Sequence, residues 1–236
     1  MGTGTLEQLR KYLEKAAGCD SRTWRNLLGC NLPKRRGMVP LLERALATDI
    51  IPQEFAKGYF AEIKREEEKL LASGFPPLYI IFSGDVGNYK TLMAVRLLAI
   101  KTVTERLTPL FLTSDELLAL YRGELHLCMF VDDVTFSVET ELRPPSYDNA
   151  QERVPFTEIT KQYDLILIDD LEEEAVEAFE KLVNQAYNTE TLLIVTTNIA
   201  PPKRLLELVS QKSRSRLAER GIPIYVQGTD KRGGAR

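Results

Sequence analysis

The residues most able to carry out chemistry lie in a short segment between an apolar run and a helical pattern. Residues 82–91 read Phe-Ser-Gly-Asp-Val-Gly-Asn-Tyr-Lys-Thr. In the pattern G-x-x-x-x-G-K-[ST], backbone N–H groups surround nucleotide phosphates, the lysine contacts the β- and γ-phosphates, and the hydroxyl ligates Mg²⁺. Lys90 and Thr91 are in register with this pattern. We therefore predict that ATP and Mg²⁺ bind to one loop, which comprises Gly84, Asp85, Val86, Gly87, Asn88, Tyr89, Lys90, Thr91 and Leu92.

One position of this loop departs from the pattern, because Tyr89 stands where a glycine normally precedes the lysine. A glycine there lets the backbone pass close to the phosphate. The Tyr89 side chain either points away, which leaves the N–H groups available, or fills the nucleotide pocket. The first alternative predicts a working ATP site and the second a weakened or lost one.

Two adjacent carboxylates follow the apolar run 165–168. In sites for nucleotide triphosphates, the first such carboxylate holds Mg²⁺ through water, and the second orients or activates the attacking water, a role usually taken by glutamate. We assign the metal to Asp169 together with Thr91, and the catalytic role to Asp170. The alternative is that both are acidic residues at a strand end, before the acidic first turn of a helix.

Two further polar groups follow in the order that such a site requires. Asn198 ends the apolar run 192–197, where its amide can position the hydrolytic water, although asparagine is also a common turn residue. An arginine from a neighbouring subunit can neutralise charge on the transferred phosphoryl group. We choose Arg216 for this arginine finger, with Arg214 in reserve; otherwise both are exposed helix residues.

Charge is unevenly distributed along the 236 residues. The net charge is −3, but residues 203–236 contain nine Lys or Arg against three acidic residues, a local net charge of +6. A basic tail of this kind contacts nucleic acid or a phosphate of a neighbouring subunit, or it is a solvated surface.

Cysteine and histidine do not indicate a metal site. Cys19, Cys30 and Cys128 are scattered, no Cys-x-x-Cys occurs, and His126 is the only histidine, whereas structural zinc needs four clustered ligands. The chain begins without the basic-then-apolar order of a secretory signal, and no apolar stretch approaches the roughly 20 residues that span a bilayer. We therefore expect a cytoplasmic protein with reduced thiols and no membrane contact.

The elements that must position these residues alternate between strands and helices, which indicates a parallel sheet covered on both faces. Five apolar runs predict strands at Leu78–Ser83, Pro109–Thr113, Asp164–Asp169, Leu192–Thr197 and Ile222–Gln227. Helical patterns cover Thr5–Ala17, Lys57–Ala72, Lys90–Arg106, Asp115–Arg122, Leu171–Tyr187 and Lys203–Val209. Ser114 is well placed to cap the helix that begins at Asp115.

The expected domain organisation is a helical N-terminal extension over residues 1–30 followed by one ATPase-like domain over residues 31–236. Residues 123–160 do not fit the strand–helix alternation. We interpret them as an elaborated connection, partly strand or hairpin, before the third core strand. Long connections are often functional.

Taken together, the motifs resemble those of AAA+ ATPases of the bacterial helicase-loader family, the DnaC/DnaI type, with the IstB transposition helper as a close relative. The resemblance covers residues 31–232. It is carried by the loop at Gly84–Thr91, Asp169-Asp170, Thr196-Thr197-Asn198, Ser215-Arg216-Leu217, the closing segment 226–232 and Asn31-Leu32-Pro33-Lys34-Arg35.

This resemblance implies an α/β fold with a five-stranded parallel sheet of order 5-1-4-3-2, sandwiched by helices. It also implies ATP and Mg²⁺ at the edge of the subunit, assembly into a homo-oligomer, contact with single-stranded DNA and delivery of a replicative DNA helicase. The chain departs from the family in Tyr89, in its short N-terminal extension and in the length of residues 123–160.

Three functions follow from these observations. The first is an ATP-dependent loader that places a replicative helicase on single-stranded DNA. The second is an IstB-like helper that binds duplex DNA and a transposase. The third is an adaptor that does not hydrolyse ATP, in which Tyr89 fills the pocket and the fold serves as a binding module.

Overall fold

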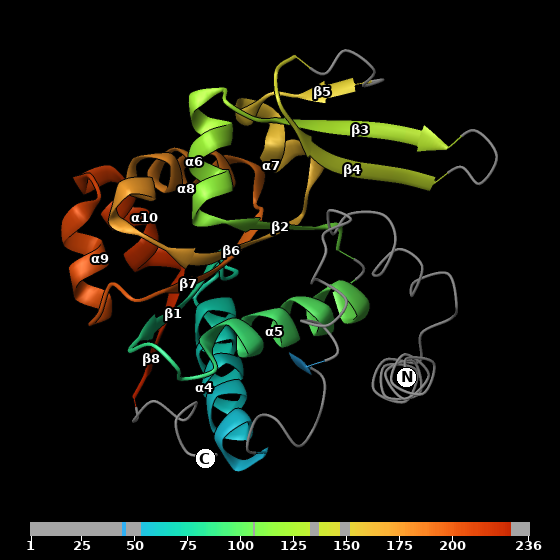
Figure 1. Ribbon diagram of the computed structural model, residues 1–236. Coiled ribbons are helices and arrows are strands. Elements are labelled where there is room, and N and C mark those ends of the chain that lie inside the picture. The colour runs from blue at the N-terminus through green and yellow to red at the C-terminus, as the bar shows by residue number, and fades with distance from the viewer. Residues whose placement is uncertain (1–43, 46–52, 106, 133–136, 147–151, 228–236) are drawn as a thin grey trace, which may run out of the picture.

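The computed structural model describes residues 44–45, 53–105, 107–132, 137–146 and 152–227 (Figure 1). The predicted extension 1–30, with its helix at Thr5–Ala17 and two of the three cysteines, lies outside the described residues, as do residues 228–236. Within the described part, no helix is long and apolar enough to cross a membrane.

The core of the molecule is a five-stranded parallel sheet. Its strands are β1 (Tyr79–Gly84), β2 (Pro109–Thr113), β6 (Leu165–Leu171), β7 (Leu192–Thr197) and β8 (Gly221–Val226), in the spatial order β2-β6-β7-β1-β8. If these five strands are numbered along the chain, this order is 2-3-4-1-5, which is 5-1-4-3-2 from the other edge. The predicted fold class and strand order are therefore confirmed.

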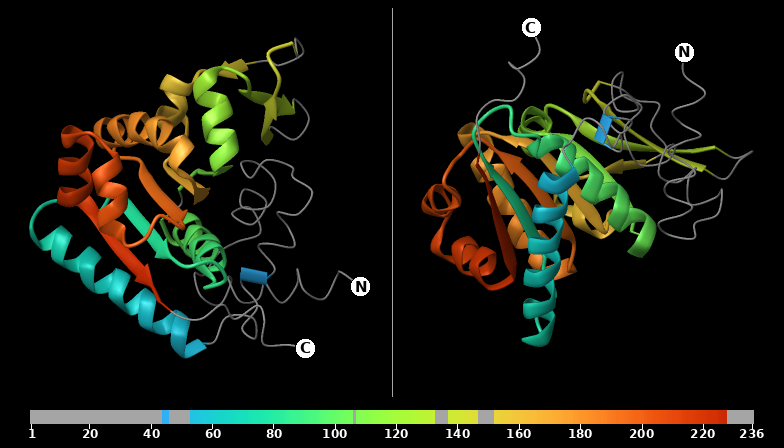
Figure 2. Two further views of the ribbon diagram at one scale, coloured as in Figure 1. Left: turned by 60° about the vertical axis from the view of Figure 1, so that its left-hand side comes forward. Right: turned by 90° about the horizontal axis from the view of Figure 1, so that it is seen from below.

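Strands β1, β2, β6 and β7 are apolar runs whose side chains alternate between two cores, so both of their faces are largely buried. The edge strand β8 buries Ile222, Ile224 and Val226 on one face and exposes Pro223 and Tyr225 on the other. One core contains Ile80 and Phe82 of β1, and the other contains Tyr79 and Ile81. Helices α4 (Gln53–Ala72) and α5 (Lys90–Glu105) cover the first face. Figures 1 and 2 show the second face beneath α6 (Ser114–Arg122), α8 (Val176–Thr189), α9 (Pro202–Leu208) and α10 (Gln211–Arg220).

Two predicted helix starts are wrong. Thr113, not Ser114, caps α6: its hydroxyl accepts from the Glu116 N–H, and the Glu116 carboxylate accepts from the Thr113 N–H. The helix predicted from Leu171 begins only at Val176, after the 3-10 turn η3 (Glu173–Ala175). Leu171 instead belongs to β6 and pairs with Thr197 of β7.

The elaborated connection contains strands, as expected from the sequence. Strands β3 (His126–Asp132), β4 (Ser137–Arg143) and β5 (Glu152–Val154) form an antiparallel sheet of order β4-β3-β5. The turn η2 (Phe156–Glu158) and helix α7 (Ile159–Gln162) then lead into β6. Leu127 and Val154 join the second core, and Figure 1 shows β3 and β4 extending from there away from the parallel sheet.

Candidate nucleotide-binding site

The predicted phosphate loop joins the carboxyl end of β1 to the first residue of α5. Gly84 has a φ of 145° and Gly87 a φ of 88°. A Cβ atom at Gly84 would lie 2.2 Å from the backbone oxygen of Val226, so the neighbouring strand β8 leaves room only for glycine. The loop thus ends in a helix N-terminus, where backbone N–H groups and the helix dipole favour an anion.

Tyr89 has a backbone conformation that favours glycine. Its φ is 60°, in the left-handed region that favours glycine. The half-buried Tyr89 side chain packs against the core beneath α4 and α5, and it also forms part of the wall of a cavity. Tyr89 thus accommodates a left-handed backbone and contributes to the cavity wall.

The cavity beside the loop has a volume of about 400 Å³. Its wall contains loop residues 86–92 together with Asp169, Asp170 and Asn198 from the carboxyl ends of β6 and the strand beside it, β7. The structure therefore brings the loop, both carboxylates and the asparagine to one place. Gly84 and Asp85 of the predicted loop do not line the cavity, although both contact Lys90.

The Lys90 side chain connects the start of the loop to the residue that follows β7. Its ammonium donates hydrogen bonds to the backbone oxygens of Gly84 (2.9 Å) and Asp85 (2.6 Å) and to Oδ1 of Asn198 (2.9 Å). Lys90 is only 7% exposed. The Lys90 ammonium thus lies in the cavity wall, held by protein oxygens that the oxygens of a bound phosphate would replace.

The first carboxylate, Asp169, lies against the start of α5. Its Oδ1 atom accepts hydrogen bonds from Oγ1 of Thr91 (2.8 Å) and Oγ1 of Thr196 (2.6 Å). Burial raises the pKa of Asp169, while these two hydrogen bonds act in the opposite direction. A cation beside this carboxylate would favour its charged form.

The second carboxylate, Asp170, lies at an irregularity in β6. Its φ is 55°, and the pairing of β6 with β7 shifts register between Ile168 and Leu171. The Asp170 Oδ1 atom accepts from Nδ2 of Asn198 at 2.7 Å. Since Asn198 also accepts from Lys90, its amide links the loop lysine to the second carboxylate.

The donor set fits ATP with Mg²⁺. A hydroxyl and a carboxylate 2.8 Å apart, Thr91 and Asp169, are the oxygen ligands that Mg²⁺ prefers. Lys90 and the helix N-terminus supply positive charge beside them, and Gly84 keeps the backbone close to β8.

Arg216 lies away from the cavity of its own subunit. On α10, its guanidinium donates to the backbone oxygen and Oδ1 of Asn184 and lies 4.4 Å from the ring centre of Tyr187 on α8. Arg214 donates to the backbone oxygens of Leu206 and Val209. Arg216 is half-buried and Arg214 is exposed, so the interpretation of both as exposed is wrong for Arg216.

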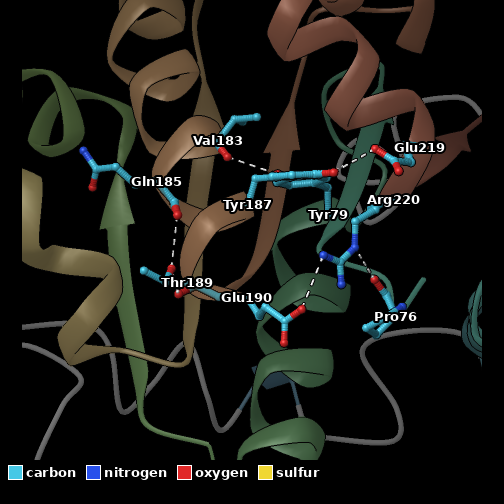
Figure 3. Close-up of polar contacts among 10 residues, drawn as sticks. Pro76, Tyr79, Val183, Gln185, Tyr187, Thr189, Glu190, Glu219 and Arg220 are labelled. Atoms are coloured by element: carbon cyan, nitrogen blue, oxygen red, sulfur yellow. Dashed lines mark hydrogen bonds and ion pairs between the residues drawn. The ribbon is translucent and has the colours of Figure 1, made fainter. Parts of the chain in front are cut away.

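Figure 3 shows the surroundings of Tyr187. Its hydroxyl donates to Glu219 at 3.1 Å, while Tyr79 beside it donates to the backbone oxygen of Val183 at 3.0 Å. Arg220 contacts Pro76 and Glu190. This cluster forms part of the contact between α8 and α10. It holds the Tyr187 ring, over which the Arg216 guanidinium lies.

Two residues of the cavity wall were missed by sequence reasoning, Arg44 and Thr196. Thr196 carried a signal, because it lies two residues before Asn198 and alternate residues of a strand share a face. Arg44 carried none: it precedes Ala45, which is fully buried in the core beneath α5, and only the fold brings it to the site.

No protein-family model matches the sequence, and no curated protein matches it. Among solved structures, the fold is similar to a DNA replication initiation factor at 19% identity and a TM-score of 0.46, over 76% of this chain and 48% of that one. A DnaC helicase loader aligns at 15% identity with a TM-score of 0.43, over 70% of this chain and 90% of that one. AMPPCP-bound DnaA from Aquifex aeolicus aligns at 20% identity with a TM-score of 0.41, over 66% of this chain and 41% of that one.

Proposed function

We propose that this protein binds and hydrolyses ATP and uses the nucleotide to control delivery of a replicative DNA helicase to single-stranded DNA. The observation that carries the ATPase part is the continuous polar network around one cavity. It connects Lys90, Asn198 and Asp170 on one side and Thr91, Asp169 and Thr196 on the other. The delivery part rests on the family resemblance of the motifs.

Each residue of the network has a defined task in this proposal. Lys90 exchanges its backbone acceptors for phosphate oxygens, and Thr91 and Asp169 hold Mg²⁺, which when bound neutralises charge on the phosphates. Asp170 orients the attacking water, and the Asn198 amide keeps Asp170 in place. Arg216 of one subunit would complete the site of the next. The exposed basic residues of α9 and α10 are available for DNA, through contacts with its phosphates.

The steady-state rate of ATP hydrolysis, measured with and without single-stranded DNA, tests the ATPase part. We expect a measurable rate that DNA stimulates, and a loss of about 100-fold or more in Lys90→Ala, because one positively charged donor is removed from the site. Lys69→Ala is the matched control, since Lys69 is an exposed lysine on α4 that pairs with Glu66. Equal rates in both variants would contradict the proposal.

Capture of the replicative helicase from the same host tests the delivery part. We expect the purified helicase to bind the wild-type protein in the presence of ATP and Mg²⁺, and Lys90→Ala to bind it with altered nucleotide dependence. A protein that hydrolyses ATP but binds no replicative helicase would contradict the loader function and leave the ATPase intact.

A second candidate function is an adaptor that does not hydrolyse ATP. The observation in its favour is that a bulky side chain, Tyr89, lines the cavity at a loop position suited to glycine. This function predicts that partner binding is the same with and without ATP and is unchanged in Lys90→Ala.

A further inference from the structure

The strand pairing around the two carboxylates contains a β-bulge. Ile168 pairs with Val195, and the next pair is Leu171 with Thr197. The two residues Asp169 and Asp170 therefore lie opposite the single residue Thr196. A bulge of this kind re-aims side chains and is frequent beside active sites.

The side chain of Thr196 bonds to both residues of the bulge. Its Oγ1 atom accepts from the backbone N–H of Asp170 at 2.8 Å and donates to Oδ1 of Asp169 at 2.6 Å. Thr196 is 1% exposed and lies in the cavity wall. Because the hydroxyl has one proton, acceptance from the amide directs that proton to the carboxylate.

The bulge needs such support, because Asp170 has a φ of 55°. Most residues other than glycine lose about 1–2 kcal/mol in this region, and aspartate enters it at a smaller cost because its short side chain can hydrogen-bond locally. The hydrogen bond from the Asp170 amide to Thr196 Oγ1 is a contact that holds this conformation.

We infer that Thr196 is a positioning residue, whose hydroxyl holds the bulge that presents Asp169 and Asp170 to the cavity. The inference rests on the proposed ATPase for its consequence, but the hydrogen bonds can be tested without nucleotide. Thr196 requires a hydroxyl, so serine replaces it and valine, of nearly the same shape, does not.

The first measurement is amide hydrogen exchange of Asp170 by NMR, in the nucleotide-free full-length protein. We expect Thr196→Val to exchange at least ~5-fold faster at this amide, since an intramolecular acceptor is lost, and Thr196→Ser to stay close to wild type. Thr197→Val is the matched control: Thr197 is also fully buried and bonds to Leu171 and Ile199, outside the cavity wall. An Asp170 amide that stays protected in Thr196→Val overturns the inference.

The second measurement separates positioning from general destabilisation. We expect Thr196→Val to lower kcat for ATP hydrolysis more than it raises KM, with recovery in Thr196→Ser and little change in Thr197→Val. If Thr196→Val does not fold, Thr196→Ala serves in both experiments. A wild-type protein without ATPase activity would defeat the proposed function, while the exchange result would still decide whether Thr196 holds the bulge.

Discussion

At the scale of single residues, Tyr89 places a large side chain on a backbone that favours glycine. Alanine at this position removes the ring but keeps the Cβ atom and its strain, whereas glycine removes both. We therefore expect Tyr89→Gly to be more stable than Tyr89→Ala by about 1 kcal/mol in urea unfolding, opposite to the usual order of these residues. An alanine variant that is the more stable of the two would show that the left-handed conformation carries no strain.

Tyr79 gives a residue-scale prediction on pH. Burial raises the pKa of Tyr79 above its usual value near 10. The folded state then keeps the proton at a pH at which the unfolded state loses it. The contribution of Tyr79 to stability is therefore complete below pH ~10 and is lost as the pH rises further.

Tyr79→Phe tests this coupling. We expect the free energy of unfolding of this variant to be about 1 kcal/mol lower than that of wild type at pH 7, because the hydrogen bond to Val183 is lost. Between pH 7 and pH ~11, the variant should lose less stability than wild type. Urea unfolding at the two pH values measures both effects. Tyr225→Phe, which removes the hydroxyl of an exposed tyrosine, is the control. An unaltered alkaline slope in Tyr79→Phe would contradict the prediction.

At the scale of elements, the close approach of β8 to the end of β1 constrains the loop. A methyl group at Gly84 would lie 2.2 Å from Val226, whereas one at Gly74, which also has a positive φ, meets nothing within 4 Å. We expect Gly84→Ala to lower the free energy of unfolding by at least ~2 kcal/mol, because of backbone strain and the displacement of β8. Gly74→Ala should lower it by only about 1 kcal/mol. Thermal unfolding measures the stability of the two variants. Equal losses of stability would contradict the prediction, because they would show that β8 moves aside without an energetic penalty.

The elements were predictable where one local pattern decides them. Buried parallel strands appear as uninterrupted apolar runs, and the order of motifs placed the loop, Asp169 and Asn198 at one edge of the sheet. The start of α6 could also have been predicted from the sequence. Thr113 and Glu116 have the spacing of a capping box, whereas the residue three positions after Ser114 is Leu117, which cannot complete one. The bulge at Asp170 was not readable, since it depends on the register between two strands distant in sequence.

At the scale of the whole molecule, the cavity and Arg216 belong to different parts of the subunit. Arg216 lies between α10 and α8, away from the wall of its own cavity. If Arg216 is the finger that we propose, it would have to act on a neighbouring subunit. The contacts of Arg216 with Asn184 and Tyr187 depend on the packing of α10 against α8, so no local pattern predicted them.

Mixing experiments test this arrangement. Lys90→Ala lacks the phosphate contact and Arg216→Ala lacks the finger, so each alone is expected to hydrolyse ATP at least ~100-fold more slowly than wild type. A mixture should recover part of the activity, because some interfaces combine an intact cavity with an intact finger. Arg65→Ala, which removes an exposed arginine paired with Glu66 on α4, is the control. Absence of recovery, with stable mixed oligomers, would exclude a finger supplied by a neighbour.

The most direct test of the central claim is calorimetric titration of ATP with Mg²⁺ into the wild type, Lys90→Ala and Tyr89→Gly. The loop geometry and the Lys90–Asn198–Asp170 network predict that the wild type and Tyr89→Gly bind and that Lys90→Ala does not. Binding by Tyr89→Gly alone would contradict the account, because it would show that Tyr89 closes the site.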